Sequence, residues 1–164
     1  MKNLTLILLL LISPIMLAGQ NLKALDDKYG FREAKFETPI DSYKNFVEIE
    51  KGIYKSTTEI LNIGEYTLDE VAYFFYNGQL STIAIRTKGY LNSRGFLSIL
   101  QEAYGMGYQR NKNIERYSWL GEKVTMSYNQ NSATGDASIF IYSIKLSDLE
   151  KAEKKKAIEA AKKL

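Results

Sequence analysis

Between Tyr66 and Lys88, two runs rich in β-branched and aromatic residues flank Asn77-Gly78. An Asn-Gly pair between such runs is typical of a type I′ turn, because that turn needs positive φ at both central residues. The stretch therefore predicts a central antiparallel hairpin, and we expect the other elements to pack on it or beside it.

A two-residue turn at Asn77-Gly78 sets the expected register of this hairpin. Phe75 then faces Leu80, and Tyr73 faces Thr82. One face is predicted to carry Val71, Tyr73, Phe75, Leu80, Thr82, Ala84 and Arg86, and the other Ala72, Phe74, Tyr76, Gln79, Ser81, Ile83 and Ile85. Neither face is plainly polar, so the pattern predicts either a hairpin covered on both sides or an exposed aromatic surface.

A second hairpin is predicted around Gly121-Glu122. One face carries apolar side chains: Tyr117, Trp119, Val124, Met126 and Tyr128. The other face carries mainly polar side chains: Arg116, Ser118, Leu120, Lys123, Thr125 and Ser127. This division is typical of a sheet with one solvated face. A further strand is expected over residues 137–144.

Helix signals occur at two places. Thr38-Pro39-Ile40-Asp41 offers a cap, a proline suited to the first helical position and an acid in the first turn, so a short helix is expected there. Asn92-Ser93 offers a second cap, and the apolar spacing continues to Tyr104, where Gly105 is a natural stop. The C-terminal residues 146–164 have strong helix propensity but a thin apolar stripe, which predicts a charged helix or a frayed tail.

These elements together predict the α+β class. We expect an antiparallel sheet of about six to seven strands with two short helices packed on it, a two-layer sandwich. The order of helix and strands occurs twice along the chain, which is typical of a topological repeat.

The first residues have the pattern of a signal peptide. Lys2 precedes an apolar run from Leu4 to Leu17, and the small residues Ala18-Gly19 follow. The run is short for a bilayer span and contains Pro14. We therefore predict a signal peptide over residues 1–19, a single domain over residues 20–145, and export to the periplasm or outside the cell. An uncleaved membrane anchor is the alternative, whereas signal cleavage would leave no membrane span.

The positive charge of the chain belongs mainly to its tail. Residues 20–144 contain 14 basic and 15 acidic residues, whereas residues 145–164 contain seven lysines and four acids. A nucleic-acid-binding domain needs a concentrated basic face. The sequence therefore predicts no nucleic-acid partner.

The residue types present limit the available chemistry. The chain has no histidine and no cysteine, which excludes disulfides, Ser-His-Asp and Cys-His nucleophiles, and thiolate or imidazole metal sites. The acidic doublets Asp26-Asp27 and Asp69-Glu70 are candidates for carboxylate chemistry by type, but neighbours in sequence usually diverge in space. The loop 129–136 has oxygen ligands but one carboxylate, so a self-satisfied turn is favoured over a calcium site. We predict no cofactor, no metal site and no enzymatic activity.

The aromatic residues give the main functional hypothesis. Tyrosine and tryptophan combine apolar area with a polar group, so they are frequent at recognition surfaces as well as in ordinary strands. The predicted binding residues are Tyr73, Phe75, Tyr117, Trp119 and Tyr128. The expected function is a non-enzymatic module that holds an envelope or secreted protein through an aromatic sheet face or an edge. One alternative is carbohydrate binding, which requires Trp119 exposed with Tyr117 or Tyr128; the other is a carboxylate-dependent hydrolase.

The order of elements resembles that of small exported α+β proteins of Gram-negative bacteria. It is also similar, in topology, to the helix-plus-sheet modules of outer-membrane assembly factors and of β-lactamase inhibitor proteins. The resemblance implies an exported domain that acts by binding, and it assigns a role to no individual residue.

Overall fold

The computed structural model describes residues 20–162 as an α+β fold built on a seven-stranded sheet. In their order across the sheet, the strands are β3 (Phe46–Glu50), β4 (Ile53–Ser56), β7 (Glu70–Tyr76), β8 (Gln79–Thr87), β11 (Ala137–Ser143), β10 (Val124–Gln130) and β9 (Arg116–Leu120). Every neighbouring pair is antiparallel. The predicted fold class is confirmed. The predicted signal peptide lies outside the described residues.

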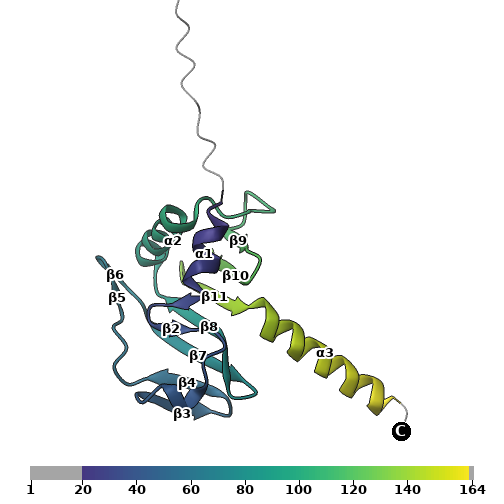
Figure 1. Ribbon diagram of the computed structural model, residues 1–164. Helices are drawn as coiled ribbons and strands as arrows, with labels where there is room; N and C mark the ends of the chain where they lie inside the picture. Colours follow the sequence, from purple (N-terminus) through teal and green to yellow (C-terminus); the bar gives the residue numbers. More distant parts are fainter. Residues whose placement is uncertain (1–19, 163–164) are drawn as a thin grey trace, which may run out of the picture.

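One face of the sheet, the inner face, is covered by helices and short hairpins (Figure 1). The covering elements are α1 (Leu22–Lys28), the hairpin β1–β2 (Gly30–Phe31 and Ala34–Lys35), the hairpin β5–β6 (Asn62–Ile63 and Tyr66–Thr67) and α2 (Tyr90–Tyr104). Phe96, Leu97 and Leu100 of α2 are buried against the sheet and close the hydrophobic core. None of the helices within residues 20–162 is long and apolar enough to cross a membrane.

The helix expected after Thr38 is the main error in the predicted elements. Only a short 3-10 turn, η1 (Ile40–Ser42), forms there, and Tyr43 is already extended. The chain instead follows the end of the first hairpin, where the Ile40 N–H donates to the carbonyl of Gly78 at 2.9 Å. Strand pairing from Phe46 onward then prevents the helix from continuing. The second helix on the inner face is α1, in the segment before the first hairpin.

The first hairpin turns at Asn77-Gly78 as predicted, and both residues have positive φ. Its register is as expected at Phe75 and Leu80, but Tyr73 pairs with Ile83 and not with Thr82. The cause is a β-bulge at Ser81, whose hydroxyl donates to the carbonyl of Phe74 at 3.0 Å. A bulge adds one residue to one strand, so every later side chain of that strand changes face.

The bulge explains why the register expected from the sequence gives this hairpin no plainly polar face. The buried side chains of the inner face are Val71, Tyr73, Leu80, Ile83, Ile85 and Thr87. The opposite or outer face carries Glu70, Ala72, Phe74, Tyr76, Gln79, Thr82, Ala84 and Arg86. Both hairpins therefore have a buried inner face, and the second hairpin has the division of side chains that its sequence predicts.

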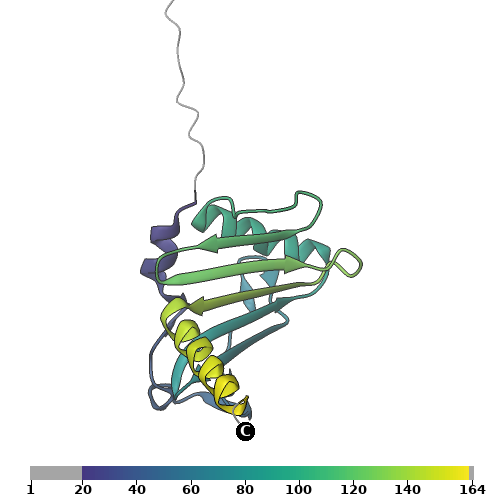
Figure 2. The same cartoon turned by 90° about the vertical axis from the view of Figure 1, so that its right-hand side faces the viewer.

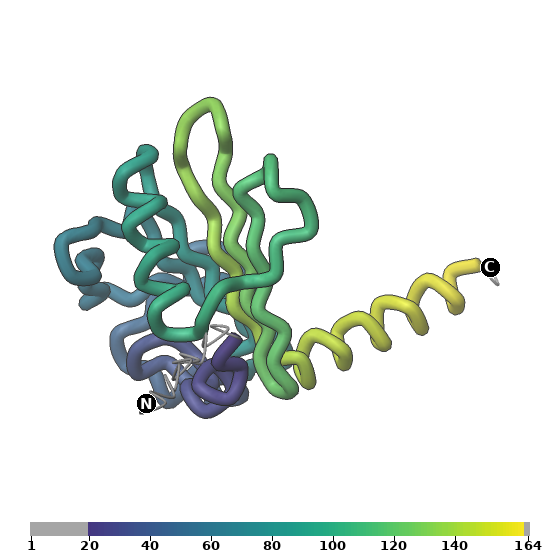
Figure 3. Tube along the Cα trace, turned by 90° about the horizontal axis from the view of Figure 1, so that it is seen from above, coloured from purple at the N-terminus to yellow at the C-terminus, as the bar shows by residue number. Residues whose placement is uncertain are grey.

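The C-terminal helix α3 (Ile144–Ala161) leaves the sheet from the end of β11 and projects from the outer face, as the tube in Figure 3 shows. Seen toward the outer face in Figure 2, α3 crosses in front of the strands. Glu153 of α3 raises the pKa of the Tyr76 hydroxyl. Leu146 is buried, whereas residues 151–162 are exposed. The predicted tail is thus a helix with little packing.

Candidate functional site

The sequence-predicted binding residues of the first hairpin are not an open surface. Tyr73 is buried in the core, and its hydroxyl donates to the carboxylate of Glu59 at 2.5 Å. Phe75 is half-buried on the same side. Of the two alternatives that the sequence leaves open, the covered hairpin is the one observed, because the elements of the inner face pack over these two rings.

Both rings belong to an aromatic cluster at the β3–β4 end of the sheet. Phe46 lies 4.5 Å from the ring of Tyr73, and Tyr43 stacks on Phe46 at 4.5 Å. Tyr54 meets Phe75 edge to face at 5.0 Å. Such offset and edge contacts stabilise the burial of aromatic rings. The aromatic residues of this cluster therefore have a packing role in the fold.

The three residues predicted from the second hairpin are also part of the core. Trp119 and Tyr128 are 0% exposed and Tyr117 is 8% exposed. The indole N–H of Trp119 donates to the carbonyl of Gly105, and the hydroxyl of Tyr128 donates to the carbonyl of Ser93. Sugar stacking on these rings is therefore excluded in this structure, because both their faces and their polar groups are already engaged.

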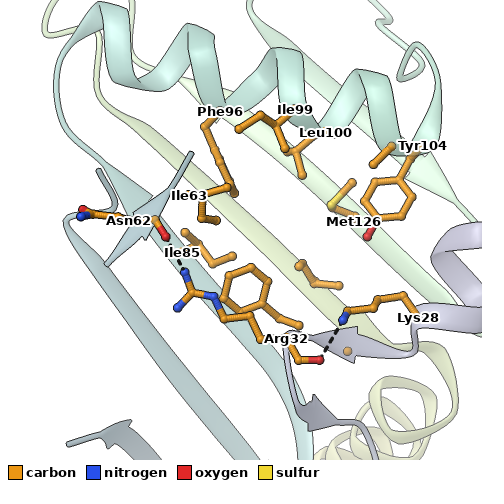
Figure 4. A pocket seen from close by; sticks show the side chains of 14 residues that line it. Lys28, Arg32, Asn62, Ile63, Ile85, Phe96, Ile99, Leu100, Tyr104 and Met126 are labelled. Carbon is orange, nitrogen blue, oxygen red and sulfur yellow. Dashed lines mark hydrogen bonds between the residues drawn. The ribbon is translucent and has the colours of Figure 1, made fainter. Parts of the chain in front are cut away.

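A cavity of about 380 Å³ lies between α2 and the inner face of the sheet. Its volume is within the usual range for small-molecule sites, about 300–1,000 Å³. Side chains from α2 form the roof, and Ile85, Met126 and Ile141 from three adjacent strands form the floor (Figure 4). The roof residues are Phe96, Ile99, Leu100, Ala103 and Tyr104. The walls are thus mainly apolar.

Two cationic side chains, Lys28 and Arg32, line the side of the cavity away from α2 (Figure 4). Arg32 forms an ion pair with Glu59 and donates to the carbonyls of Ile60 and Asn62, the latter at 3.1 Å. These bonds connect the β1–β2 turn to the β5–β6 hairpin. Arg32 therefore fixes the wall of the cavity, and its charge is neutralised there.

Lys28 has a different environment from Arg32. Its ammonium group donates to the carbonyl of Arg32 at 2.8 Å. It forms no ion pair within the described residues, and no carboxylate lines the cavity in that part of the chain. A lysine ammonium has three N–H donors. The cavity therefore has an apolar interior and one cation that is not neutralised by a carboxylate.

Three ionisable side chains line the cavity within the described residues: Lys28, Arg32 and Tyr104. Tyr104 is the one ionisable side chain in the roof, and burial raises the pKa of its hydroxyl. A tyrosine with a raised pKa stays neutral at neutral pH, so its hydroxyl can donate and accept hydrogen bonds. The cavity thus offers apolar contacts, a neutral hydroxyl and a cation.

The other candidate sites from the sequence have structural roles. Asp26 accepts hydrogen bonds from a turn, and Asp69 forms an ion pair with Lys88 at 2.8 Å. In the loop 129–136, the side chain of Asn131 accepts from the backbone N–H groups of Ala133 and Thr134. No cluster of acidic ligands suited to a metal ion occurs within residues 20–162.

Comparison with protein-family models, with curated proteins and with solved structures gives no match for this chain. A function is therefore inferred from the cavity. The apolar spacing that continues to Tyr104 predicts the helix of the roof, but the sequence contains no signal for the cavity itself. Lys28 and Arg32 lie in the segment before the first hairpin, where local patterns are weak.

Proposed function

We propose that this protein is a non-enzymatic binding protein that holds a small apolar molecule in the cavity under α2. The observation that carries the proposal is the apolar cavity of about 380 Å³ between α2 and the sheet. Concave, mainly apolar sites with few polar groups are the usual form of small-molecule sites. Because the chain is expected to be exported, we expect it to bind this ligand in the cell envelope or outside the cell.

The cavity has the rigidity that a ligand site needs. Its floor is formed by the strands β8, β10 and β11, each of which has a paired strand on both sides. Its roof is a helix whose neighbouring side chains are buried in the core. A preformed site lowers the entropic cost of binding because few side chains must be ordered.

A direct test uses the neutral fluorescent probe N-phenyl-1-naphthylamine with the chain that begins at Gln20. We expect saturable binding with an increase in fluorescence. Ile99→Trp fills the cavity from the roof and is expected to weaken binding by about tenfold or more, by loss of apolar contact area. Ile158→Trp makes the same change on exposed α3 and should bind as the unchanged protein does.

The folding of each variant is checked by thermal unfolding, and Ala103→Phe fills the cavity from a second position. Absence of binding by the unchanged protein contradicts the proposal. Equal binding by folded Ile99→Trp and Ala103→Phe also contradicts it, because the probe then binds elsewhere.

A protein partner on the outer face of the sheet is the second candidate function. The observation that favours it is Phe140, which is 43% exposed in the middle of the sheet, on β11. Phe140 lies opposite Ala84 on β8 and opposite Ser127 on β10, so few large side chains surround it. This candidate retains the expected mode of action, recognition by an aromatic sheet face, but with different residues.

The second candidate is tested with Phe140→Ser in a capture experiment from envelope extract. Phe140 is a better choice than Tyr73 or Phe75, because serine at those two packed positions would also destabilise the fold. A partner captured by the unchanged chain and lost with folded Phe140→Ser supports this function. Equal capture by both proteins contradicts it.

A further inference from the structure

We infer that the ligand of the cavity is a single-chain apolar carboxylate whose anionic group pairs with Lys28; this rests on the function proposed above. A buried or half-buried ammonium group is favoured when a carboxylate pairs with it. Lys28 is half-buried, lines the cavity and has no such partner within the described residues. A ligand carboxylate can supply that partner.

The carboxylates nearest in sequence to Lys28 are engaged elsewhere. Asp27 forms an ion pair with Lys23, one turn earlier on the same helix. Asp26 accepts three backbone hydrogen bonds from the β9–β10 turn. Both acidic residues of α1 therefore have partners other than Lys28.

A second ammonium group strengthens the positive potential near this wall. Lys35, on β2, donates from its ammonium group to the backbone carbonyl of Lys28 at 2.6 Å. Arg32 contributes little to this potential, because Glu59 neutralises it. The local field thus favours an anion at the end of the cavity where Lys28 lies.

The side chains that line the cavity determine the chemical class of the rest of the ligand. Beyond Lys28 the cavity is lined by Phe31, Ile63, Ile99 and other apolar side chains. A sugar or a small polar acid would lose hydrogen bonds to water there without replacement. An unbranched hydrocarbon chain buries apolar surface and gains about 0.8 kcal/mol per CH₂ group. The combination of one cation and an apolar interior matches a carboxylate with a hydrocarbon chain.

Lys28 also has donors free to make this contact. One N–H donates to the carbonyl of Arg32, which orients the ammonium group at the cavity wall. The other donors can bind a carboxylate oxygen while this bond is kept. Hydrogen bonds between an ammonium group and a carboxylate are shorter and stronger than those between neutral groups.

The experiment compares dodecanoate with dodecanol, which have the same chain length but differ in charge. Affinities are measured at neutral pH, below the critical micelle concentration, by calorimetry. We expect dodecanoate to bind the unchanged protein about tenfold more tightly than dodecanol, through the charge-assisted hydrogen bond. Lys28→Met should remove this difference by weakening dodecanoate and leaving dodecanol unchanged.

Two further variants separate charge from structure. Lys28→Arg keeps a cation and should retain the preference for dodecanoate. Lys156→Met removes an exposed lysine from α3, away from the cavity, and should leave both affinities unchanged. Thermal unfolding of each variant shows whether the fold is kept.

The outcomes distinguish this inference from the proposed function. If both ligands bind with equal affinity, or if folded Lys28→Met keeps the preference for dodecanoate, the role of Lys28 is wrong and the cavity remains a binding site. If neither ligand binds and the neutral fluorescent probe does not bind either, the proposed function and this inference are both wrong.

Discussion

The carboxylate of Asp26 accepts a hydrogen bond from the backbone N–H of Val124, 98 positions further along the chain, at 2.9 Å. The same carboxylate accepts from Glu122 at 2.8 Å and from Lys123 at 2.9 Å. Gly121 leaves room for this contact, because a Cβ there would crowd the carboxylate. One acidic side chain thus fastens α1 to the turn between β9 and β10.

We predict that Asp26→Ala destabilises the fold by about 1.5–3 kcal/mol, because three N–H groups lose a charged acceptor. Asp27→Ala is the matched control. Asp27 is exposed and pairs only with Lys23 one turn away, so its loss should cost about 0.5 kcal/mol or less. Urea unfolding measures both changes. Equal stability of the two variants would show that the turn is held without Asp26.

The same contact predicts a pH dependence of stability. Burial raises the pKa of Asp26, but its hydrogen bonds to Glu122, Lys123 and Val124 outweigh burial and keep the pKa below its usual value. The folded state thus binds this proton less tightly than the unfolded state, whose pKa is about 3.9. The stabilisation is complete above that pH and is lost as the pH falls through the folded pKa.

The test of this dependence is the stability of the unchanged protein and of Asp26→Ala between pH 7 and pH 2. We expect the difference between them to be constant at neutral pH and to shrink in the acid range. A constant difference at all pH values would contradict the contribution of the ionised carboxylate.

Gly95 lies inside α2 where the ring of Tyr66 passes over the helix, and a Cβ at this position would overlap that ring. We predict that Gly95→Ala destabilises by about 1–3 kcal/mol through overpacking. In a Tyr66→Ala background the sign should reverse, because alanine is about 1 kcal/mol better than glycine within a helix. Urea unfolding of the four proteins of this double-mutant cycle measures the coupling between the two positions. Absence of coupling would show that the Tyr66 ring moves aside in Gly95→Ala.

Arg32 joins the β1–β2 turn to the β5–β6 hairpin, and this connection closes one wall of the cavity. We predict that Arg32→Gln increases amide hydrogen exchange over residues 60–67 by about tenfold or more, as local opening becomes easier. Arg110→Gln changes an exposed arginine away from this wall and serves as the control. Unchanged exchange in Arg32→Gln would show that other contacts hold the hairpin.

The helix α3 contributes little to the stability of the sheet beyond its first turn. We predict that removal of residues 150–164 changes the free energy of unfolding by about 0.5 kcal/mol or less, because residues 151–162 are exposed. Leu146→Ala is the contrasting variant and should cost about 2–5 kcal/mol, since Leu146 is buried. A large loss on truncation would show that α3 packs on the outer face in solution.

The two hairpins show how far local patterns predict this fold. In the second hairpin, alternation assigns the faces of both strands correctly, because no bulge interrupts β9 and β10. Its register differs from that of a two-residue turn at Gly121-Glu122, since Leu120 pairs with Thr125 and not with Lys123. In the first hairpin, the turn is predicted correctly, but the residues after Leu80 are assigned to the wrong faces of the sheet. Ser81 bulges there, and serine is an ordinary strand residue with no local signal for a bulge.

The sequence predicts the candidate site less well than it predicts the fold. The predicted binding aromatics Tyr117, Trp119 and Tyr128 pack in the core, because strands favour the same residues that recognition surfaces favour. The cavity is made by α2, three strands and two short hairpins that are distant in sequence. A pattern within one segment of the chain does not predict a cavity that forms between several segments.

The sequence by itself determined the α+β class, the turn at Asn77-Gly78, the end of α2 at Gly105 and the absence of histidine and cysteine chemistry. These features depend on residue type and on the period of one strand or helix. The tertiary structure decided the bulge, the role of Asp26 and the cavity beside Lys28. Each of these depends on contacts between segments far apart in the chain, which local periodicity does not encode.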